Sequence, residues 1–350
     1  MEPLLQLLSE NIDGYGELPL ILQYLIPMLV GCLLCLVIVL LVPLVCNWLE
    51  RKVAAHMQDR LGPMRVGGWH GWAQPLADGL KLLQKEDIIP SEADKLLFRL
   101  APIVVFVGGF AAFVVLPFGA TAIVSDLNIG ILYVVAISSI TVVGIIMAGW
   151  ASNNKYALFG GMRAAAQIVS YEIPTVMAIL CVVIEVGSLS MQDIVRAQAG
   201  GIWNWFINPL KYPFLFLAFF VHYIGSLAEV NRTPFDIPEA ESELVSGYHT
   251  EYSGMRFAFF YLAEYANMFL VSAISVTLFF GGWYGLLGES LIPGPLIFIG
   301  KAMILVFIQM WLRWTLPRLR VDQLLHVSWK VLLPASFLLV LGTGTLAVRW

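Results

Sequence analysis

Long apolar runs separated by polar connections dominate the sequence. Eight of these runs reach the length of about 20 residues that a helix needs to cross the hydrocarbon core of a bilayer. They cover residues 24–46, 98–117, 129–150, 163–185, 212–230, 255–281, 296–316 and 329–348. Because a backbone in lipid must satisfy its own hydrogen bonds, each run is predicted to be helical. The pattern predicts an all-α, polytopic transmembrane bundle that forms one integral membrane domain over residues 1–350.

A shorter pattern in the first polar connection predicts an interfacial helix. Over residues 72–85, apolar side chains recur at helical spacing on one face from Trp72 to Leu83, and polar side chains occupy the other face. The segment is too short to cross a bilayer, so we expect it to lie in the plane of the membrane surface. On its polar face, Asp78 and Lys81 are predicted to form a solvated i,i+3 ion pair.

Composition supports this class and excludes others. The chain is 59% hydrophobic and 13% charged, whereas about 25% of the residues in soluble domains are charged. Its formal net charge of −4 provides no basic surface for nucleic acid. The cysteines lie in or beside apolar runs, and no second ligand pair follows the spacing of Cys32 and Cys35. Packed thiols are therefore expected rather than a metal or redox site.

Lysine and arginine predict the orientation of the bundle. Of 20 such residues, 16 fall in or beside the connections after the first, third, fifth and seventh runs. The other four are Arg196, Lys211, Lys301 and Arg349. By the positive-inside rule, we expect those connections in the cytoplasm and both chain termini on the non-cytoplasmic side.

The most acidic stretch, residues 228–252, lies in the cytoplasmic connection after the fifth run. Its sequence is AEVNRTPFDIPEAESELVSGYHTEY, and its acids are Glu229, Asp236, Glu239, Glu241, Glu243 and Glu251. Asp236 and Glu239 suit a helix N-cap and capping box, but capping does not account for the later acids. Crowded carboxylates beside a low-dielectric region repel one another, so part of the group is expected to be protonated and to titrate as a unit.

Two further acids, Glu172 and Glu264, lie inside apolar runs, on the cytoplasmic side of each. An acid within a membrane is costly unless it is paired, hydrated or protonated, and it is a functional candidate by default. Two residues after Glu172, Pro174 leaves the Ser170 carbonyl without its helical hydrogen bond. With Glu229 and the acidic stretch, these acids predict a carboxylate path for protons. A cation site and, for Glu172, a neutral hydrogen bond that serves packing remain the alternatives.

Other polar residues have a structural interpretation from the sequence. Glu50 and Arg51 end the first run, where charges fix helices at the membrane surface, and a functional role is equally compatible with their position. Arg318 and Arg320 suit the positive-inside rule, and His222 is expected to be a packing residue.

In their order along the chain, these motifs resemble the membrane subunit beside the peripheral arm of respiratory complex I, the NADH:quinone oxidoreductase. The matching stretches are Glu50-Arg51-Lys52, 58–67, 74–90, 152–156, 163–174, 229–252 and 313–325, which together sample essentially the whole chain. Two positions depart from the pattern of that family. Met64 replaces the asparagine of a Gly-Pro-Asn-Arg turn, and His249 stands where asparagine or glutamine is common.

The resemblance implies part of a quinone chamber and a carboxylate-lined channel that couples quinone reduction to proton translocation. Ubiquinone or menaquinone is then a substrate at a subunit interface, and no NAD, flavin, iron–sulfur cluster or metal belongs to this chain. The residues implied for the quinone cavity are Arg51, Arg60, Arg232, Phe235, Asp236 and Arg313, with Arg313 and also Arg318 as weaker assignments. Those implied for the proton path are Glu172, Glu229, Glu239, Glu241, Glu243, Glu251 and Glu264.

The resemblance also implies a bacterial plasma (inner) membrane location and several partners. These are the cluster-bearing and quinone-site subunits of the peripheral arm, the small and antiporter-like membrane subunits, and membrane lipid. Two alternatives stay open: the related subunit of a membrane-bound hydrogenase, and a stand-alone proton-coupled transporter. The transporter is disfavoured because such proteins often pair broken helices across inverted repeats, and the sequence has one such break, at Pro174.

Overall fold

The computed structural model describes residues 19–238, 241–288 and 292–347, in which the regular structure is helical. Seven helical segments are long and apolar enough to cross a membrane, and α8 is a shorter apolar helix. The predicted fold class, an all-α membrane bundle of about eight spans, is thereby confirmed. Six of these segments contain α2 (Leu20–Met57), α4 (Lys95–Ala112), α5 (Gly130–Ala151), α6 (Lys155–Val186), α10 (Gly254–Phe279) and α11 (Gly294–Thr315), and the seventh, Val321–Ala347, contains α12 (Val321–His326) and α13 (Leu333–Ala347). The shorter helices are α3 (Gln74–Gln84), α7 (Met191–Ala197), α8 (Pro213–Glu229) and α9 (Glu241–Leu244).

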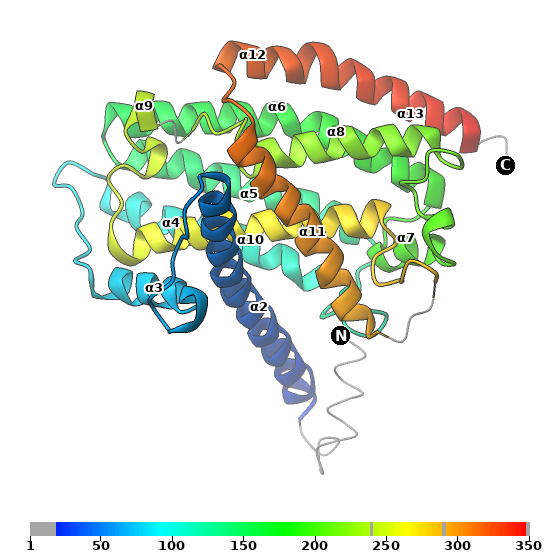
Figure 1. Ribbon diagram of the computed structural model, residues 1–350, viewed down its shortest axis with the longest axis horizontal. Helices are drawn as coiled ribbons and strands as arrows, with labels where there is room; N and C mark the ends of the chain where they lie inside the picture. Colours follow the sequence, from blue (N-terminus) through cyan, green and yellow to red (C-terminus); the bar gives the residue numbers. More distant parts are fainter. Residues whose placement is uncertain (1–18, 239–240, 289–291, 348–350) are drawn as a thin grey trace.

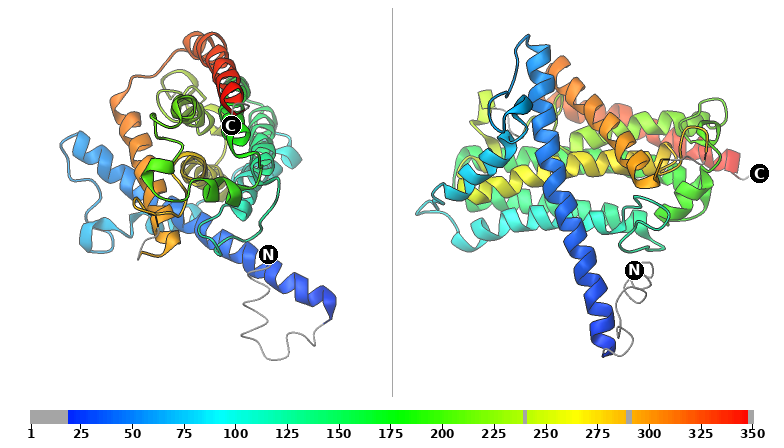
Figure 2. Two further views of the ribbon diagram at one scale, coloured as in Figure 1. Left: turned by 90° about the vertical axis from the view of Figure 1, so that its right-hand side faces the viewer. Right: turned by 60° about the horizontal axis from the view of Figure 1, so that its bottom comes forward.

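Helix α10 lies at the centre of the bundle. It packs against α2, α4, α8 and α11, and the views agree that α2 crosses it steeply (Figures 1 and 2). In its most apolar 18-residue stretch, 83% of the residues are buried, against 28% in α2. Residues placed on α10 therefore face protein rather than lipid, which makes it the natural carrier of internal polar groups.

Helix α2 extends well beyond the other helices at its N-terminal end (Figure 2). Its 38 residues correspond to about 57 Å at 1.5 Å per residue, nearly twice the hydrocarbon core of about 30 Å. The first half is apolar and largely exposed, whereas Asn47, Glu50 and Ala54 near its end are buried. The helix therefore carries polar side chains into the interior of the bundle at its C-terminal end.

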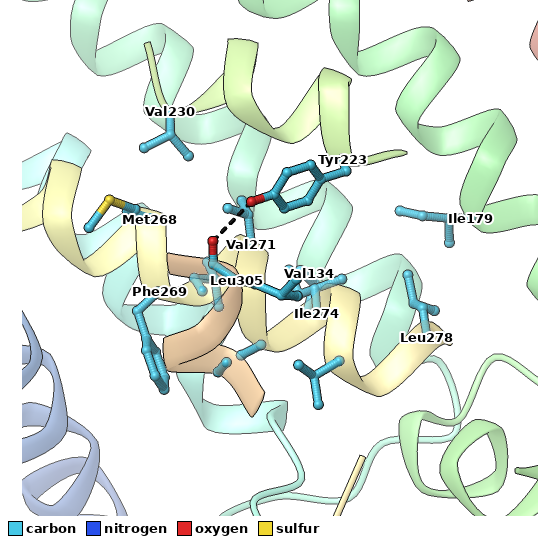
Figure 3. Close-up of a cluster of buried hydrophobic side chains, with 14 of the residues drawn as sticks. Val134, Ile179, Tyr223, Val230, Met268, Phe269, Val271, Ile274, Leu278 and Leu305 are labelled. Atoms are coloured by element: carbon cyan, nitrogen blue, oxygen red, sulfur yellow. Dashed lines mark hydrogen bonds between the residues drawn. The ribbon is translucent and has the colours of Figure 1, made fainter. Parts of the chain in front are cut away.

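Close packing of aliphatic and aromatic side chains surrounds α10. Figure 3 shows part of this core, in which the Tyr223 hydroxyl donates to the Leu305 carbonyl at 2.9 Å. Helices α6 and α8 approach closely because Gly225 has no side chain. A Cβ placed there would lie 1.9 Å from the Thr175 hydroxyl oxygen.

On the side remote from the acidic connection, Lys301 joins the ends of α10 and α11. Its ammonium donates to the carbonyls of Phe280 at 2.6 Å, Gly282 at 3.0 Å and Tyr284 at 2.7 Å. It also lies 4.0 Å from the ring centroid of Trp205. A positive charge at the C-terminal end of a helix is favourable because the free carbonyls there carry partial negative charge.

Candidate functional site

A cavity of about 350 Å³ lies where the ends of α2 and α11 meet the start of α10 and the 230–253 connection. We call it the polar chamber. Its lining residues are Asn47, Glu50, Arg51, Ala54, Arg60, Arg232, Ser246, Tyr248, His249, Phe257, Phe260, Tyr261, Glu264, Tyr265, Arg313 and Trp314. Four residues predicted for a quinone cavity, Arg51, Arg60, Arg232 and Arg313, thus come together around one space. The lining also includes Glu264, which was predicted for the proton path.

Two arginines and two glutamates form a buried charge cluster in the chamber wall. Arg232 Nη1 donates to both Glu50 carboxylate oxygens at 3.2 Å, and its Nη2 lies 3.1 Å from Glu264 Oε1. Arg313 Nη1 donates to Glu50 Oε1 from the other side. The side chains of Arg232 and Glu50 are only 2% and 7% exposed. Buried charges are tolerated when they are paired and hydrogen-bonded, and the four formal charges here sum to zero.

Arg232 owes its position to the sharp exit from α8. The helix ends at Glu229, and Asn231 adopts a positive φ of 54°, which turns the chain back toward the bundle. The guanidinium then lies 4.5 Å from the ring centroid of Tyr265 on α10. Burial alone lowers the pKa of Arg232, but the carboxylates of Glu264 and Glu50 outweigh it and hold this pKa well above its ordinary value. Arg232 is therefore a permanent cation in the chamber.

At the rim of the chamber, Arg51 pairs with Asp78 of the interfacial helix α3. Arg51 Nη2 lies 2.7 Å from Asp78 Oδ2, and Gln74 donates to the same carboxylate at 3.2 Å. The predicted partner, Lys81, is more distant at 3.9 Å. The expectation of a simple solvated pair on α3 was therefore incomplete, because the tertiary fold brings α2 against the polar face of this helix.

A second cavity, of about 470 Å³ and mostly apolar, adjoins the polar chamber between α2, α3 and α10. It is bounded by side chains such as Leu40, Leu83 and Leu262. Four residues, Asn47, Arg51, Phe257 and Tyr261, line both cavities. Within this shared wall the Tyr261 hydroxyl donates to Asn47 Oδ1 at 3.1 Å. The two cavities share this wall, and their lining changes from apolar, beside α3, to charged, beside Glu50.

Glu172 and Glu229 form a second acidic group, on α6 and at the end of α8. Glu172 accepts a hydrogen bond from Ser139 on α5. Ser138 of α5 lies near Glu229, and the Glu229 carboxylate is close enough to Glu172 for the two to repel each other. Neighbouring serines on α5 therefore lie beside both acids inside the bundle.

The acids of the 230–253 connection make separate contacts at one edge of the bundle. Glu243 pairs with Arg163 at 2.6 Å, and Glu251 accepts from Asn154 Nδ2 at 2.5 Å. Glu239 lies outside the described residues, and Glu241 begins α9, with its side chain outside the description. The described members of the predicted carboxylate path therefore occupy three places: the polar chamber, the α5–α6–α8 contact and this edge.

Phe235 and Asp236, also predicted for the quinone cavity, are not among the chamber's lining residues. The Phe235 ring packs against Tyr171 of α6 with 5.1 Å between centroids. Asp236 Oδ2 lies 3.1 Å from Arg318 Nη2. The capping box expected for Asp236 includes Glu239, which lies outside the described residues, so it stays a prediction. The described residues show instead that Asp236 forms an ion pair with the connection after α11.

His249 contributes a neutral polar ring to the chamber. It packs against Tyr248 and Phe257, at centroid distances of 4.9 and 5.4 Å. Burial lowers the pKa of His249 to about 4, because the charged imidazolium would lose hydration. At neutral pH its ring nitrogens therefore offer one donor and one acceptor.

Glu50 is the main site residue whose role the sequence left undecided. It accepts from two arginines that are 182 and 263 residues away along the chain. A local signal does exist, since Pro43, Asn47, Glu50 and Ala54 recur at helical spacing and are all buried. A stripe of small and polar residues on an otherwise apolar helix indicates a face directed toward protein.

Comparison with known proteins places this arrangement among respiratory membrane proteins. The family model described as NADH dehydrogenase matches residues 30–344. The chain is 57% identical over 302 residues to the H subunit of the NADH-quinone oxidoreductase of Chlorobaculum tepidum, covering 82% of this chain and 83% of that protein. It is 48% identical over 351 residues to an H subunit of the same enzyme of Geobacter metallireducens, covering 95% and 98%. It is also 49% identical over 322 residues to an H subunit from Rhizobium etli, covering 89% and 92%.

Proposed function

We propose a function from the premise that this chain belongs to the NADH dehydrogenase family: it is a membrane subunit of an NADH-quinone oxidoreductase, and its polar chamber receives the quinone headgroup. The observation that carries the proposal is the pair of adjoining cavities, one apolar beside α3 and one charged beside Glu50. A quinone has the same two-part chemistry, because its isoprenoid tail is apolar and its ring carries two carbonyl oxygens.

The chain's own residues suit three tasks in this reaction. The apolar cavity takes the tail as the quinone arrives from lipid. Arg51, Arg60 and Arg313 line the chamber and provide N–H donors for the ring oxygens. In this proposal the electrons come from an iron–sulfur protein in a neighbouring subunit, as the resemblance to the family implies.

The acids complete the proposal as a proton path. Reduction of a quinone to a quinol consumes two electrons and two protons, so charge develops in the chamber next to Glu264 and Arg232. Glu264, Glu172 and Glu229 respond by changing protonation, and Glu239, Glu241, Glu243 and Glu251 connect this response to the cytoplasmic surface. Chains of acidic side chains relay protons within membranes. Serine hydroxyls such as Ser139 can both donate and accept hydrogen bonds along such a chain.

The remaining features of the proposal follow from the family and from charge. The chain forms one integral membrane domain in the bacterial plasma membrane, with the acidic connection in the cytoplasm and both termini on the other side. Its partners are the cluster-bearing and quinone-site subunits of the peripheral arm and the small and antiporter-like membrane subunits. Lipid surrounds the exposed half of α2.

The test is the Glu229→Gln variant of the assembled complex in proteoliposomes. We expect NADH:quinone turnover and proton uptake to fall together, because the substitution keeps the shape and removes the titration. Glu185→Gln is the matched control, since Glu185 lies on the same α6 as Glu172 but borders a different cavity near Lys211. Full coupled activity of Glu229→Gln would contradict the proposal. A separate measurement adds a quinone-type inhibitor to the purified complex. If the inhibitor fails to displace bound quinone, the hydrogenase-type alternative is favoured.

A further inference from the structure

Residues 318–329, between α11 and α13, contact two functional regions at once. We call them the connecting segment. One end touches the cytoplasmic connection at 234–236, and the other end touches α6 beside Glu172. Figure 1 shows this segment and α12 leading from the end of α11 to the outer edge of the bundle, next to α6.

At the α6 end, the connecting segment satisfies the break caused by Pro174. The Ser170 carbonyl, freed by that proline, accepts from the Ser328 hydroxyl at 2.6 Å, and Trp329 Nε1 donates to Ser170 Oγ at 3.2 Å. The Tyr171 hydroxyl donates to the Leu324 carbonyl at 2.9 Å. Ser328, Tyr171 and Leu324 are at most 1% exposed. Two buried hydrogen bonds and one partly buried one thus fix two consecutive residues of α6.

The geometry at this end depends on a local change of helix type. Residues Val327–Leu332 form a π-helix, in which Leu333 N donates to the Ser328 carbonyl five residues earlier. π-Segments are rare and are frequently found at functional sites. Here the π-segment contains both Ser328 and Trp329, the two side chains that contact Ser170.

At the loop end, the segment is attached through both backbone and side chain. Leu319 N donates to the Pro234 carbonyl at 3.1 Å, and Arg318 pairs with Asp236 at 3.1 Å. Asp236 is also near enough to Glu264 for their carboxylates to repel each other. The loop end is therefore electrostatically adjacent to the polar chamber.

We propose that the connecting segment is a positioning element that couples residues 234–236 to Glu172, an inference that rests on the proposed function. Glu172 follows Ser170 by two residues and is held from the opposite side by Ser139 of α5. A displacement of the loop moves Leu319, and the short helix α12 carries that displacement to Leu324 and Ser328. Ser170 then shifts relative to α5, which changes the hydrogen bond between Ser139 and Glu172. Packed hydrogen-bonded chains of this kind carry coupling between separate sites.

The test measures turnover and quinone KM of the assembled complex in proteoliposomes carrying Ser328→Ala. We expect kcat to fall by about five-fold, the factor that corresponds to one hydrogen bond, with KM unchanged because Ser328 does not line the chamber. Ser328→Thr restores the hydroxyl and is expected to restore kcat. Adding Arg318→Gln to Ser328→Ala is expected to cause no further loss, because both act on one series of contacts.

Controls separate this inference from local destabilisation and from the proposed function itself. Ser336→Ala is matched, since Ser336 is buried in the following helix and donates only to the Leu333 carbonyl of its own helix; we expect normal turnover. If Ser328→Ala does not assemble, Trp329→Phe removes the second donor and is expected to give the same kcat effect. Normal kcat in Ser328→Ala or Trp329→Phe, while Glu172→Gln is inactive, would overturn the positioning role alone. Normal coupled turnover in Glu172→Gln would instead contradict the proton path.

Discussion

Neutralising Glu50 is expected to destabilise the polar chamber strongly. In the folded protein the Glu50 carboxylate accepts from Arg232 and from Arg313, and it is only 7% exposed. The Glu50→Gln variant keeps nearly the same shape but leaves two guanidinium groups beside one remaining carboxylate, Glu264. The wall of the chamber then carries an uncompensated positive charge in a region with little water.

The expected loss of folding free energy in Glu50→Gln depends on the partners that each arginine keeps. Removing one partner of a buried ion pair costs about 3–5 kcal/mol. Arg232 keeps Glu264 at 3.1 Å, and the Arg313 side chain is 27% exposed and gains hydration. We therefore expect a loss at the lower end of that range, about 3 kcal/mol.

The assay compares melting temperatures of the assembled complexes, measured under identical conditions. Asp193→Asn is the control, because Asp193 and Arg196 form an exposed pair at 3.6 Å, worth less than about 1 kcal/mol. The double variant Glu50→Gln with Arg313→Gln removes one charge of each sign and is expected to recover part of the loss. Equal melting temperatures for Glu50→Gln and Asp193→Asn, or additive losses in the double variant, would refute the reasoning.

Three further predictions concern other parts of the chain. Asp78→Asn frees Arg51 at the shared wall of the two cavities. We therefore expect an altered KM for long-tailed quinones and an unchanged KM for short-tailed analogues. Equal shifts in KM for both would count against entry of the quinone tail through the apolar cavity. Because burial lowers the pKa of His249 to about 4, below its unfolded value of about 6.5, its neutral form supports stability fully above pH 6.5. That contribution, about 3 kcal/mol at most, is lost as the pH falls from 6.5 toward 4. His249→Gln is therefore expected to flatten the dependence of the melting temperature on pH over this range, and an unchanged dependence would contradict it. Lys301→Gln removes a cation bonded to three carbonyls and is expected to lower the melting temperature without changing quinone KM, whereas the exposed Lys211→Gln leaves both unchanged.

Much of the fold was predictable because membrane helices are determined by local sequence. A run of about 20 apolar residues has no alternative to a helix in lipid, and the amphipathic period of the interfacial helix is equally local. The pairing of α2 with the face of α3 was not predictable from either pattern. It places Arg51 against Asp78 and separates two cavities of different polarity.

The sequence by itself determined which residues are chemically unusual: acids such as Glu172 and Glu264 within apolar runs, and the Ser170 carbonyl that Pro174 leaves without its helical partner. Only the tertiary structure decided their partners. Glu50 gains its role from arginines far away in the chain, and the Ser170 carbonyl is satisfied by Ser328 of the connecting segment. The physical reason is that desolvation is a local cost, readable from the residue and its neighbours in sequence, whereas its compensation depends on which distant groups the bundle brings within hydrogen-bonding distance.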